Sequence, residues 1–193
     1  MLKFLLPLLL ISANAQAQAF DLRTMPEDYS FVSLAPDARV TLRFIGRNGD
    51  LYLFDELIEQ HDGTTKTAQI RVNQASQTTY WSLNGNWRAF FPHDCGPSLG
   101  ECTYTWSDED GSVNMRSITK LVGDIWLSDT YYENGSEWVF WSRDCTVYDE
   151  FGFWIDFVRL DSDDETSFGA RERAGETRLD ELWQVCDPPD FIS

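Results

Sequence analysis

The sequence has 193 residues, four cysteines and a formal net charge of −17 at pH 7. A charge of this sign and size repels nucleic acids and anionic membrane surfaces, and no nucleic-acid partner is expected. It is compatible with cationic partners or divalent cations, although a solvated acidic surface is the simpler explanation.

The first nineteen residues have the pattern of a secretory signal peptide. Lys3 supplies a positive charge, Phe4 to Ile11 are apolar, and Ala-x-Ala cleavage sites end at Ala15 and Ala19. The apolar run is shorter than the roughly 20 residues that a membrane-spanning helix needs. We therefore expect a signal peptide at residues 1–19, a single β-rich domain at residues 20–193, and an extracytoplasmic location, periplasmic or secreted. No transmembrane segment is expected in the mature chain.

Export would make the four cysteines candidates for disulfide bonds. Four cysteines allow three connectivities. Cys95 and Cys102 bracket a six-residue loop that contains Gly and Pro, so we expect them to pair, which leaves Cys145 to pair with Cys186. A zinc site needs a closer grouping of ligands than these cysteines and the two histidines offer. No metal and no cofactor is therefore predicted.

Most of the chain after Pro36 alternates strand-forming residues with turns that contain Gly. Strands are expected at residues 40–46, 51–60, 65–72, 78–83, 87–91, 103–106, 113–121 and 153–160, and on both sides of Asn134-Gly135. Their short connections cannot form parallel crossovers. We therefore predict a mainly all-β fold, an antiparallel meander of about ten strands that closes into a barrel or forms a sandwich.

Short helical pieces are expected near both ends of this domain. Thr24 precedes Met25-Pro26-Glu27-Asp28, which favours a capped helical turn. Residues 166–175 have no strand pattern and are expected to form a loop. Residues 177–186 place apolar side chains at helical spacing, which favours an amphipathic helix over an edge strand.

The most distinctive stretch is the aromatic hairpin predicted around Asn134-Gly135. An Asn-Gly pair accepts positive φ and suits a two-residue type I′ turn. In that register Tyr132 pairs with Glu137, and Tyr131 pairs with Trp138. The face expected to be core consists of Ile125, Leu127, Tyr131, Trp138 and Phe140. The opposite face, expected to bind a ligand or partner, carries Trp126, Tyr132 and Trp141.

An internal repeat is one interpretation of the two Asn-Gly pairs. Asn84-Gly85 lies 50 residues before Asn134-Gly135, and the same offset relates Asp94-Cys95 to Asp144-Cys145. These matches indicate a duplicated hairpin unit. The alternative is that aromatic residues follow any Asn-Gly hairpin.

Several short patterns resemble functional motifs without completing one. Residues 96–100 match G-x-S-x-G, but no His follows Ser98, which excludes the hydrolase order. Acidic residues at 108–111 and 161–165 resemble calcium loops without fitting the EF-hand, and a solvated turn is the simpler interpretation. Acids inside predicted strands would be desolvated if they point inward, and these are Glu56, Glu59, Asp129 and Asp156.

No coherent catalytic set emerges, so no catalytic residue is predicted. We expect an exported, non-enzymatic β-sheet module that binds an unknown ligand or protein partner. The alternative is a small extracytoplasmic hydrolase that uses buried carboxylates. Two inward carboxylates in one open cleft would favour the hydrolase, whereas a closed apolar cavity or a flat aromatic patch would favour the binding module.

Overall fold

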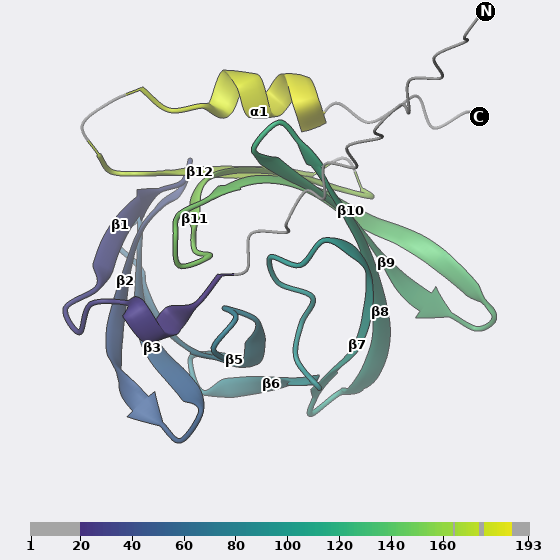
Figure 1. Ribbon diagram of the computed structural model, residues 1–193, viewed down its shortest axis with the longest axis horizontal. Coiled ribbons are helices and arrows are strands. Elements are labelled where there is room, and N and C mark those ends of the chain that lie inside the picture. The colour runs from purple at the N-terminus through teal and green to yellow at the C-terminus, as the bar shows by residue number, and fades with distance from the viewer. Residues whose placement is uncertain (1–19, 164, 174–175, 187–193) are drawn as a thin grey trace, which may run out of the picture.

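The computed structural model describes residues 20–163, 165–173 and 176–186. Within these ranges, twelve strands form a closed antiparallel barrel in which β1 pairs with β12 (Figure 1). The strands are β1 (Ser30–Leu34), β2 (Ala38–Asn48), β3 (Leu51–Gln60), β4 (Thr65–Val72), β5 (Thr78–Leu83), β6 (Asn86–Phe91), β7 (Gly100–Asp108), β8 (Gly111–Val122), β9 (Ile125–Asn134), β10 (Glu137–Tyr148), β11 (Trp154–Asp161) and β12 (Thr166–Arg171). A 3-10 helix, η1 (Leu22–Thr24), precedes them and α1 (Leu179–Cys186) follows them. The predicted all-β meander that closes into a barrel is confirmed.

The strand boundaries agree best where turn residues are clearest. The bounds of β3, β4 and β5 match the predicted ranges, and the predicted C-terminal helix is present as α1. The expected number of about ten strands is too low, because β1 and β12 were not predicted. β12 occupies residues that were expected to form a loop.

The N-terminal segment closes one end of the barrel. The expected short N-terminal helical piece is present as η1, but it lies before Thr24 and not after it. It is capped by Asp21, whose Oδ1 accepts a 3.0 Å bond from the Arg23 amide, while residues 26–29 form only a single hydrogen-bonded turn. Leu22 and Met25 are buried in a cluster with side chains from inside the barrel. These barrel residues are Leu42, Phe44, Tyr52, Phe54, Val72 and, from the β10–β11 loop, Phe151.

Two further loops fill the same end of the barrel. Figure 1 shows the β6–β7 and β10–β11 connections folded inside the ring of strands, next to η1. Gly152, in the β10–β11 loop, has a φ of +84°, and a Cβ there would lie 2.8 Å from the Phe20 ring. Only glycine permits this close approach, so the loop and the N-terminal segment pack tightly together.

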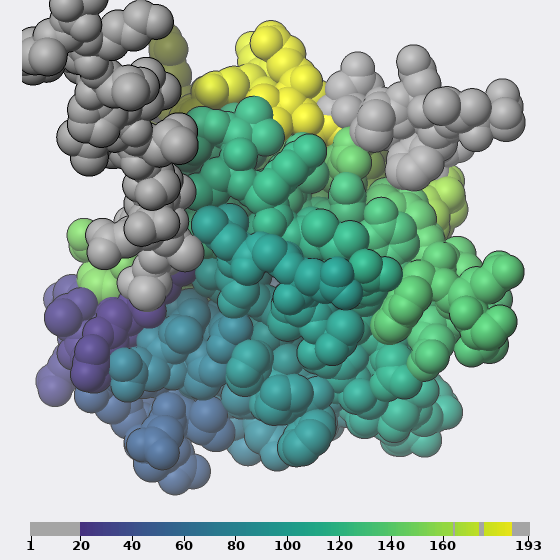
Figure 2. All heavy atoms as spheres, turned by 45° about the vertical axis from the view of Figure 1, so that its right-hand side comes forward, coloured from purple at the N-terminus to yellow at the C-terminus, as the bar shows by residue number. Residues whose placement is uncertain are grey.

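The C-terminal helix covers part of the outer wall (Figures 1 and 2). Leu182 packs against Ile125, Leu127 and Val158 from the outer face of β9 and β11. The Cys145–Cys186 disulfide joins β10 to α1, and Cys95 pairs with Cys102. Both predicted disulfides are therefore confirmed, and the barrel has hydrophobic cores on both sides of its sheet.

The aromatic hairpin is real, but its predicted turn and register are wrong. Asn134 pairs with Glu137, so the turn residues are Gly135, with a φ of 66°, and Ser136. Positive φ at the first turn position is the type II′ pattern. Tyr132 consequently faces Val139, and Tyr131 faces Phe140. The other Asn-Gly pair behaves as expected, because both Asn84 and Gly85 have positive φ.

The two aromatic sets of this hairpin do lie on opposite faces of the sheet. The set that was expected to be core faces outward. Within it only Ile125 and Leu127 are buried, because α1 covers them. Trp138 is 39% exposed, near the tip of a hairpin that extends beyond the barrel wall (Figures 1 and 2). The expectation that this whole face is core is therefore wrong for Trp138, and Phe140 is only half-buried.

Candidate functional site

A cavity lies inside the barrel, between the β6–β7 loop and the wall formed by β7 to β11. Its volume is about 320 Å³, which is sufficient for a small molecule. Its charged lining residues are Asp94, Asp144 and Arg159, and its aromatic ones are Tyr104, Trp141, Tyr148, Trp154 and Phe157. The hydroxyl groups belong to Ser117, Ser128, Thr130, Ser142 and Thr146. We call this space the lumenal cavity.

Strand register places a row of hydroxyl groups on one wall of the lumenal cavity. Ser117 of β8 pairs with Thr130 of β9, which pairs with Ser142 of β10. Side chains of directly paired residues lie on the same face of a sheet, so all three point inward. The hydroxyls of Ser117 and Thr130 are 2.9 Å apart, as are those of Thr119 and Ser128. Each hydroxyl has further donor or acceptor capacity for a ligand.

A β-bulge brings an acid to this wall. The β9–β10 register shifts between Phe140 and Ser142, so Trp141 and Ser142 both line the lumenal cavity. The shift reverses the alternation that follows and turns Asp144 inward. Burial raises the pKa of the Asp144 carboxyl, while the nearby Arg159 acts in the opposite direction.

A second acid, Asp94, reaches the lumenal cavity from the β6–β7 loop. Its Oδ1 accepts a 2.7 Å hydrogen bond from the backbone amide of Thr78. Burial raises the pKa of this carboxyl to about 6, although hydrogen bonds from Thr78 partly offset the effect. Two carboxyl groups with raised pKa values therefore line one cavity.

Arg159 of β11 is the single guanidinium among the residues that line the lumenal cavity. Its Nε donates a 2.8 Å bond to Asp161, whereas its Nη1 is 3.7 Å from the Asp144 carboxylate. The guanidinium carbon also lies 4.8 Å from the centre of the Trp141 ring. Arg159 is thus shared between two acids and an aromatic ring.

Two phenols complete the polar lining. Burial raises the pKa of Tyr104 and of Tyr148, and the charges of Asp94 and Asp144 raise both further. Both phenols are therefore neutral at physiological pH. A neutral phenol both donates and accepts hydrogen bonds, so each can orient a polar ligand.

The three predicted ligand-binding aromatic residues occupy different places. Trp141 lines the lumenal cavity and stacks against Trp106 at 6.1 Å between ring centres. Trp126 is buried beneath other rings and contacts Tyr148, which lines the cavity. Tyr132 faces the barrel interior opposite Val139, but it is not among the lining residues.

The four strand acids singled out in the sequence do not meet in one site. Three of them form ion pairs: Glu59 with Arg39 at 3.4 Å, Asp129 with Arg143 at 2.6 Å, and Asp156 with Arg173 at 2.6 Å. Glu56 points into the barrel, where burial raises its pKa to about 7. Sequence reasoning missed Asp94 and Asp144 as site residues. Their shared position before a disulfide cysteine was the one available signal.

The other motif-like patterns gain no support from the described residues. Ser98 accepts a 2.8 Å bond from Gln77 Nε2 and has no hydrogen bond to a histidine. Among the described residues, no group of three or more His, Cys, Asp or Glu side chains is arranged to hold a metal ion. In the same part of the chain, no helix combines the length and the apolar character required to cross a membrane.

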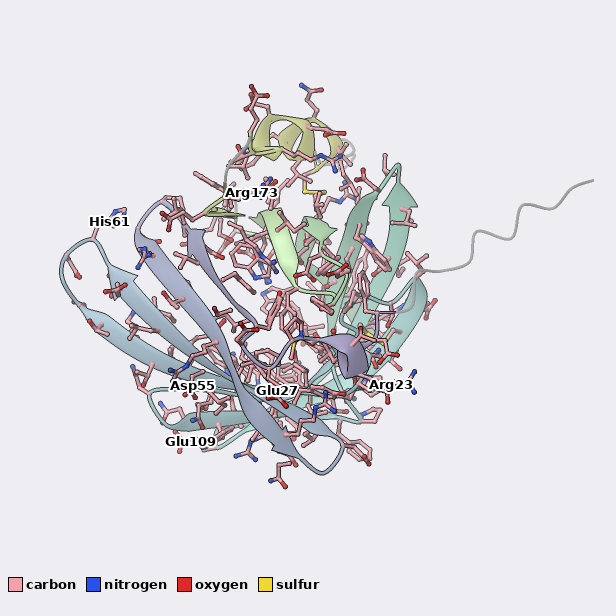
Figure 3. All side chains as sticks on the ribbon, turned by 60° about the vertical axis from the view of Figure 1, so that its left-hand side comes forward. Arg23, Glu27, Asp55, His61, Glu109 and Arg173 are labelled. Atoms are coloured by element: carbon pink, nitrogen blue, oxygen red, sulfur yellow. A yellow bond between two sulfur atoms is a disulfide. The ribbon has the colours of Figure 1, made fainter. Side chains whose placement is uncertain are left out.

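A second hollow lies on the outer face of β2 to β6, on the side of the molecule where Figure 3 labels Asp55. This outer groove has a volume of about 690 Å³. Arg43 and Asp55, its two charged residues with outward side chains, lie 3.9 Å apart. Trp87 also lines the outer groove and is 38% exposed. The groove therefore has an aromatic wall and little net charge.

No protein-family model and no curated protein matches this chain. A search of solved structures finds similarity to a crystal structure described as a "putative lipoprotein" from Parabacteroides distasonis. The two chains are 9% identical with a TM-score of 0.44, and the match covers 81% of this chain and 98% of the other. Similarity at this level supplies no argument about function.

Proposed function

We propose that this chain is an exported, non-enzymatic β-barrel that binds a small polar ligand in the lumenal cavity. The observation that carries the proposal is the polar lining of an interior space. Protein interiors are usually close-packed and apolar, and each buried polar group without a partner costs free energy. Carboxyl, guanidinium, phenol and hydroxyl groups around one cavity are better explained by a ligand that pairs with them.

The proposal gives the aromatic residues separate roles. Trp141 lies in the wall of the lumenal cavity and would contact the ligand directly. Trp126 contacts Tyr148, so it would act by positioning that phenol. Tyr132 would extend the aromatic wall beyond the cavity, because it faces the interior on the strand that carries Thr130.

Export belongs to the same proposal. The predicted signal peptide at residues 1–19 lies outside the described residues. The two disulfides are compatible with an extracytoplasmic location, because such bonds persist in oxidising compartments. We propose that the protein functions in the periplasm or after secretion.

Ligand screening against matched variants tests where binding occurs. Sugars, polyols, amines and carboxylic acids would be screened by thermal shift and their affinities measured by calorimetry. Trp141→Ala should weaken binding by about tenfold or more, whereas Trp87→Ala, in the outer groove, should leave the affinity unchanged. The reverse result would place binding in the outer groove and contradict the proposal.

A hydrolase remains a second candidate because two acids with raised pKa values line the lumenal cavity. Glycoside hydrolysis commonly uses such a pair, one of them protonated as the general acid. Incubation with chromogenic glycosides tests this function directly. Turnover that disappears in both Asp94→Asn and Asp144→Asn would establish the hydrolase, and ligand binding without turnover would support the binding module.

A further inference from the structure

We infer that the ligand of the lumenal cavity is a small organic cation that carries an ammonium group. This inference rests on the proposed function and specifies the chemistry of its ligand. Three features of the lumenal cavity support it: unbalanced carboxylates, a guanidinium committed elsewhere, and aromatic walls.

The first feature is the absence of a cationic partner for Asp94. Among the described residues, no Lys, Arg or His nitrogen forms an ion pair with this carboxylate. Its hydrogen-bond donors are uncharged groups of Thr78 and the backbone amide of Gly96. The neighbouring His93 lowers the pKa of Asp94 through its charge, but its Nδ1 is directed to a backbone oxygen, 2.8 Å away. A buried carboxylate without a cation is unfavourable. A ligand cation in the cavity would supply the missing charge.

The second feature is that Arg159 cannot balance the remaining acids. Its Nε is 2.8 Å from Asp161, while its closest approach to Asp144 is 3.7 Å. Asp144 and Asp161 thus share a single guanidinium, which leaves Asp94 as a further carboxylate in the lining of the cavity. The potential in the lumenal cavity is therefore negative, and the net charge of −17 adds to it.

The third feature distinguishes an organic cation from a metal ion. Hard metal ions prefer several oxygen ligands, commonly carboxylates, in a close set. Among the described residues, no group of three or more His, Cys, Asp or Glu side chains is arranged to hold a metal ion. The walls instead offer the rings of Tyr104, Tyr148, Trp154 and Phe157. Aromatic faces attract organic cations. The same barrel already shows this contact where the Arg88 guanidinium lies 4.1 Å from the Trp106 ring centre.

The titration behaviour of the acids agrees with a cationic ligand. Burial disfavours the charged forms of Asp94 and Asp144, which raises their pKa values. Among the charged groups around them, His93 lowers the pKa of Asp94, Arg159 lowers that of Asp144, and Asp161 and Asp129 raise that of Asp144. A bound cation favours the charged forms. Binding should therefore strengthen as the pH rises from about 5 to about 7.5, because fewer protons must then be displaced.

Calorimetry with isosteric probes tests the inference. The probes are 1,4-diaminobutane and trimethylammonium as cations, 1,4-butanediol as the neutral isostere and succinate as the anion. At least one cation should bind about tenfold or more tightly than the diol, and succinate should not bind. Asp94→Asn and Asp144→Asn should each weaken cation binding by about tenfold, whereas Asp55→Asn, on the outer face, should not change it.

Each other outcome overturns a defined claim. If neutral sugars or the diol bind in the lumenal cavity and no ammonium compound does, the cation inference fails while the proposed function survives. If calcium chloride binds and displaces the amines, the ligand is a metal ion and the inference also fails. If no probe or sugar loses affinity on Trp141→Ala or on either Asp→Asn change, both the inference and the proposed function fail. Circular dichroism of each variant would confirm that it is folded.

Discussion

Glu56 is an acid in an apolar part of the barrel wall. It lies on β3 between the inward-facing Phe54 and Ile58, with Leu42 and Ala68 paired beside it. Burial raises its pKa from 4.5 to about 7. A raised carboxyl pKa means that the folded state binds the proton more tightly than the unfolded chain does. The resulting cost is absent below about pH 4 and fully present above about pH 7.

Glu56→Gln should therefore stabilise the protein at high pH and not at low pH. The neutral amide avoids the cost of the buried charge, so we expect a gain in unfolding free energy of about 1–3 kcal/mol at pH 8 and about zero at pH 4. Urea denaturation at both pH values measures this difference. Glu59→Gln is the matched control, because Glu59 lies exposed on the same strand. Equal effects of Glu56→Gln at both pH values would contradict the pKa assignment.

Gly169 supports the wall of the lumenal cavity from β12. A Cβ at this position would lie 2.7 Å from Cε1 of Phe157, its partner on β11. Gly169→Ala should therefore displace the Phe157 ring, which lines the lumenal cavity. We expect a loss of about 1–3 kcal/mol in unfolding free energy and weaker ligand binding. In the double variant with Phe157→Leu the losses should be less than additive, and strict additivity would show that the two residues do not clash.

The hairpins β5–β6 and β9–β10 form a matched pair, because each has an Asn-Gly sequence at its tip. Asn84 has a φ of 49° and accepts a hydrogen bond from the Thr67 amide, whereas Asn134 ends a strand without positive φ. Asn84→Ala should cost about 1 kcal/mol, because alanine is disfavoured in the left-handed region. Asn134→Ala should cost less than about 0.5 kcal/mol. Equal costs in urea denaturation would indicate that both hairpins use their Asn in the turn.

The sequence predicted correctly those elements whose formation depends mainly on neighbouring residues. Turn residues bound β3, β4 and β5, and the apolar stripe of residues 177–186 predicted a helix whose Leu182 and Cys186 are buried. β1 and β12 are different, because they are short and pair with each other across the closure of the barrel. Their formation depends on pairing between residues far apart in the sequence, and no local sequence pattern predicts such pairing.

The site was harder to predict because it depends on a shift in strand register. Gly135 suits the second position of a type I′ turn and the first position of a type II′ turn, so the sequence leaves the hairpin register open. The bulge at Trp141 then decides which side chains face inward. Without it, alternation would turn Asp144 outward, away from the lumenal cavity. Asp94 lies on a loop, where periodicity gives no direction.

Closure of the barrel depends on the short pairing between β1 and β12, which we call the seam. β1 and β12 are paired at Ser33–Arg171 and Leu34–Ala170. Arg171 also donates to Asp149 at 2.7 Å, and Asp149 accepts a hydrogen bond from the Tyr29 hydroxyl. One carboxylate thus links β12 to the β10–β11 loop and to the N-terminal segment. Among the strand pairs of the barrel, β1 and β12 have the fewest paired residues. The Arg171–Asp149 contact beside them can be weakened by a single substitution.

Hydrogen exchange should therefore detect opening first at this seam. Amides of β1 and β12 should exchange faster than those of β9 and β10, because few paired residues protect them. Asp149→Asn keeps an oxygen for the loop amides but removes the charge that holds Arg171, so exchange at the seam should accelerate further. Asp124→Asn is the control, because Asp124 pairs with Arg178 next to α1. Loss of that ion pair should accelerate the exchange of amides in α1 and leave the seam unchanged. If Asp149→Asn accelerated amide exchange equally in all strands, the barrel would open as one unit and the seam would have no separate stability.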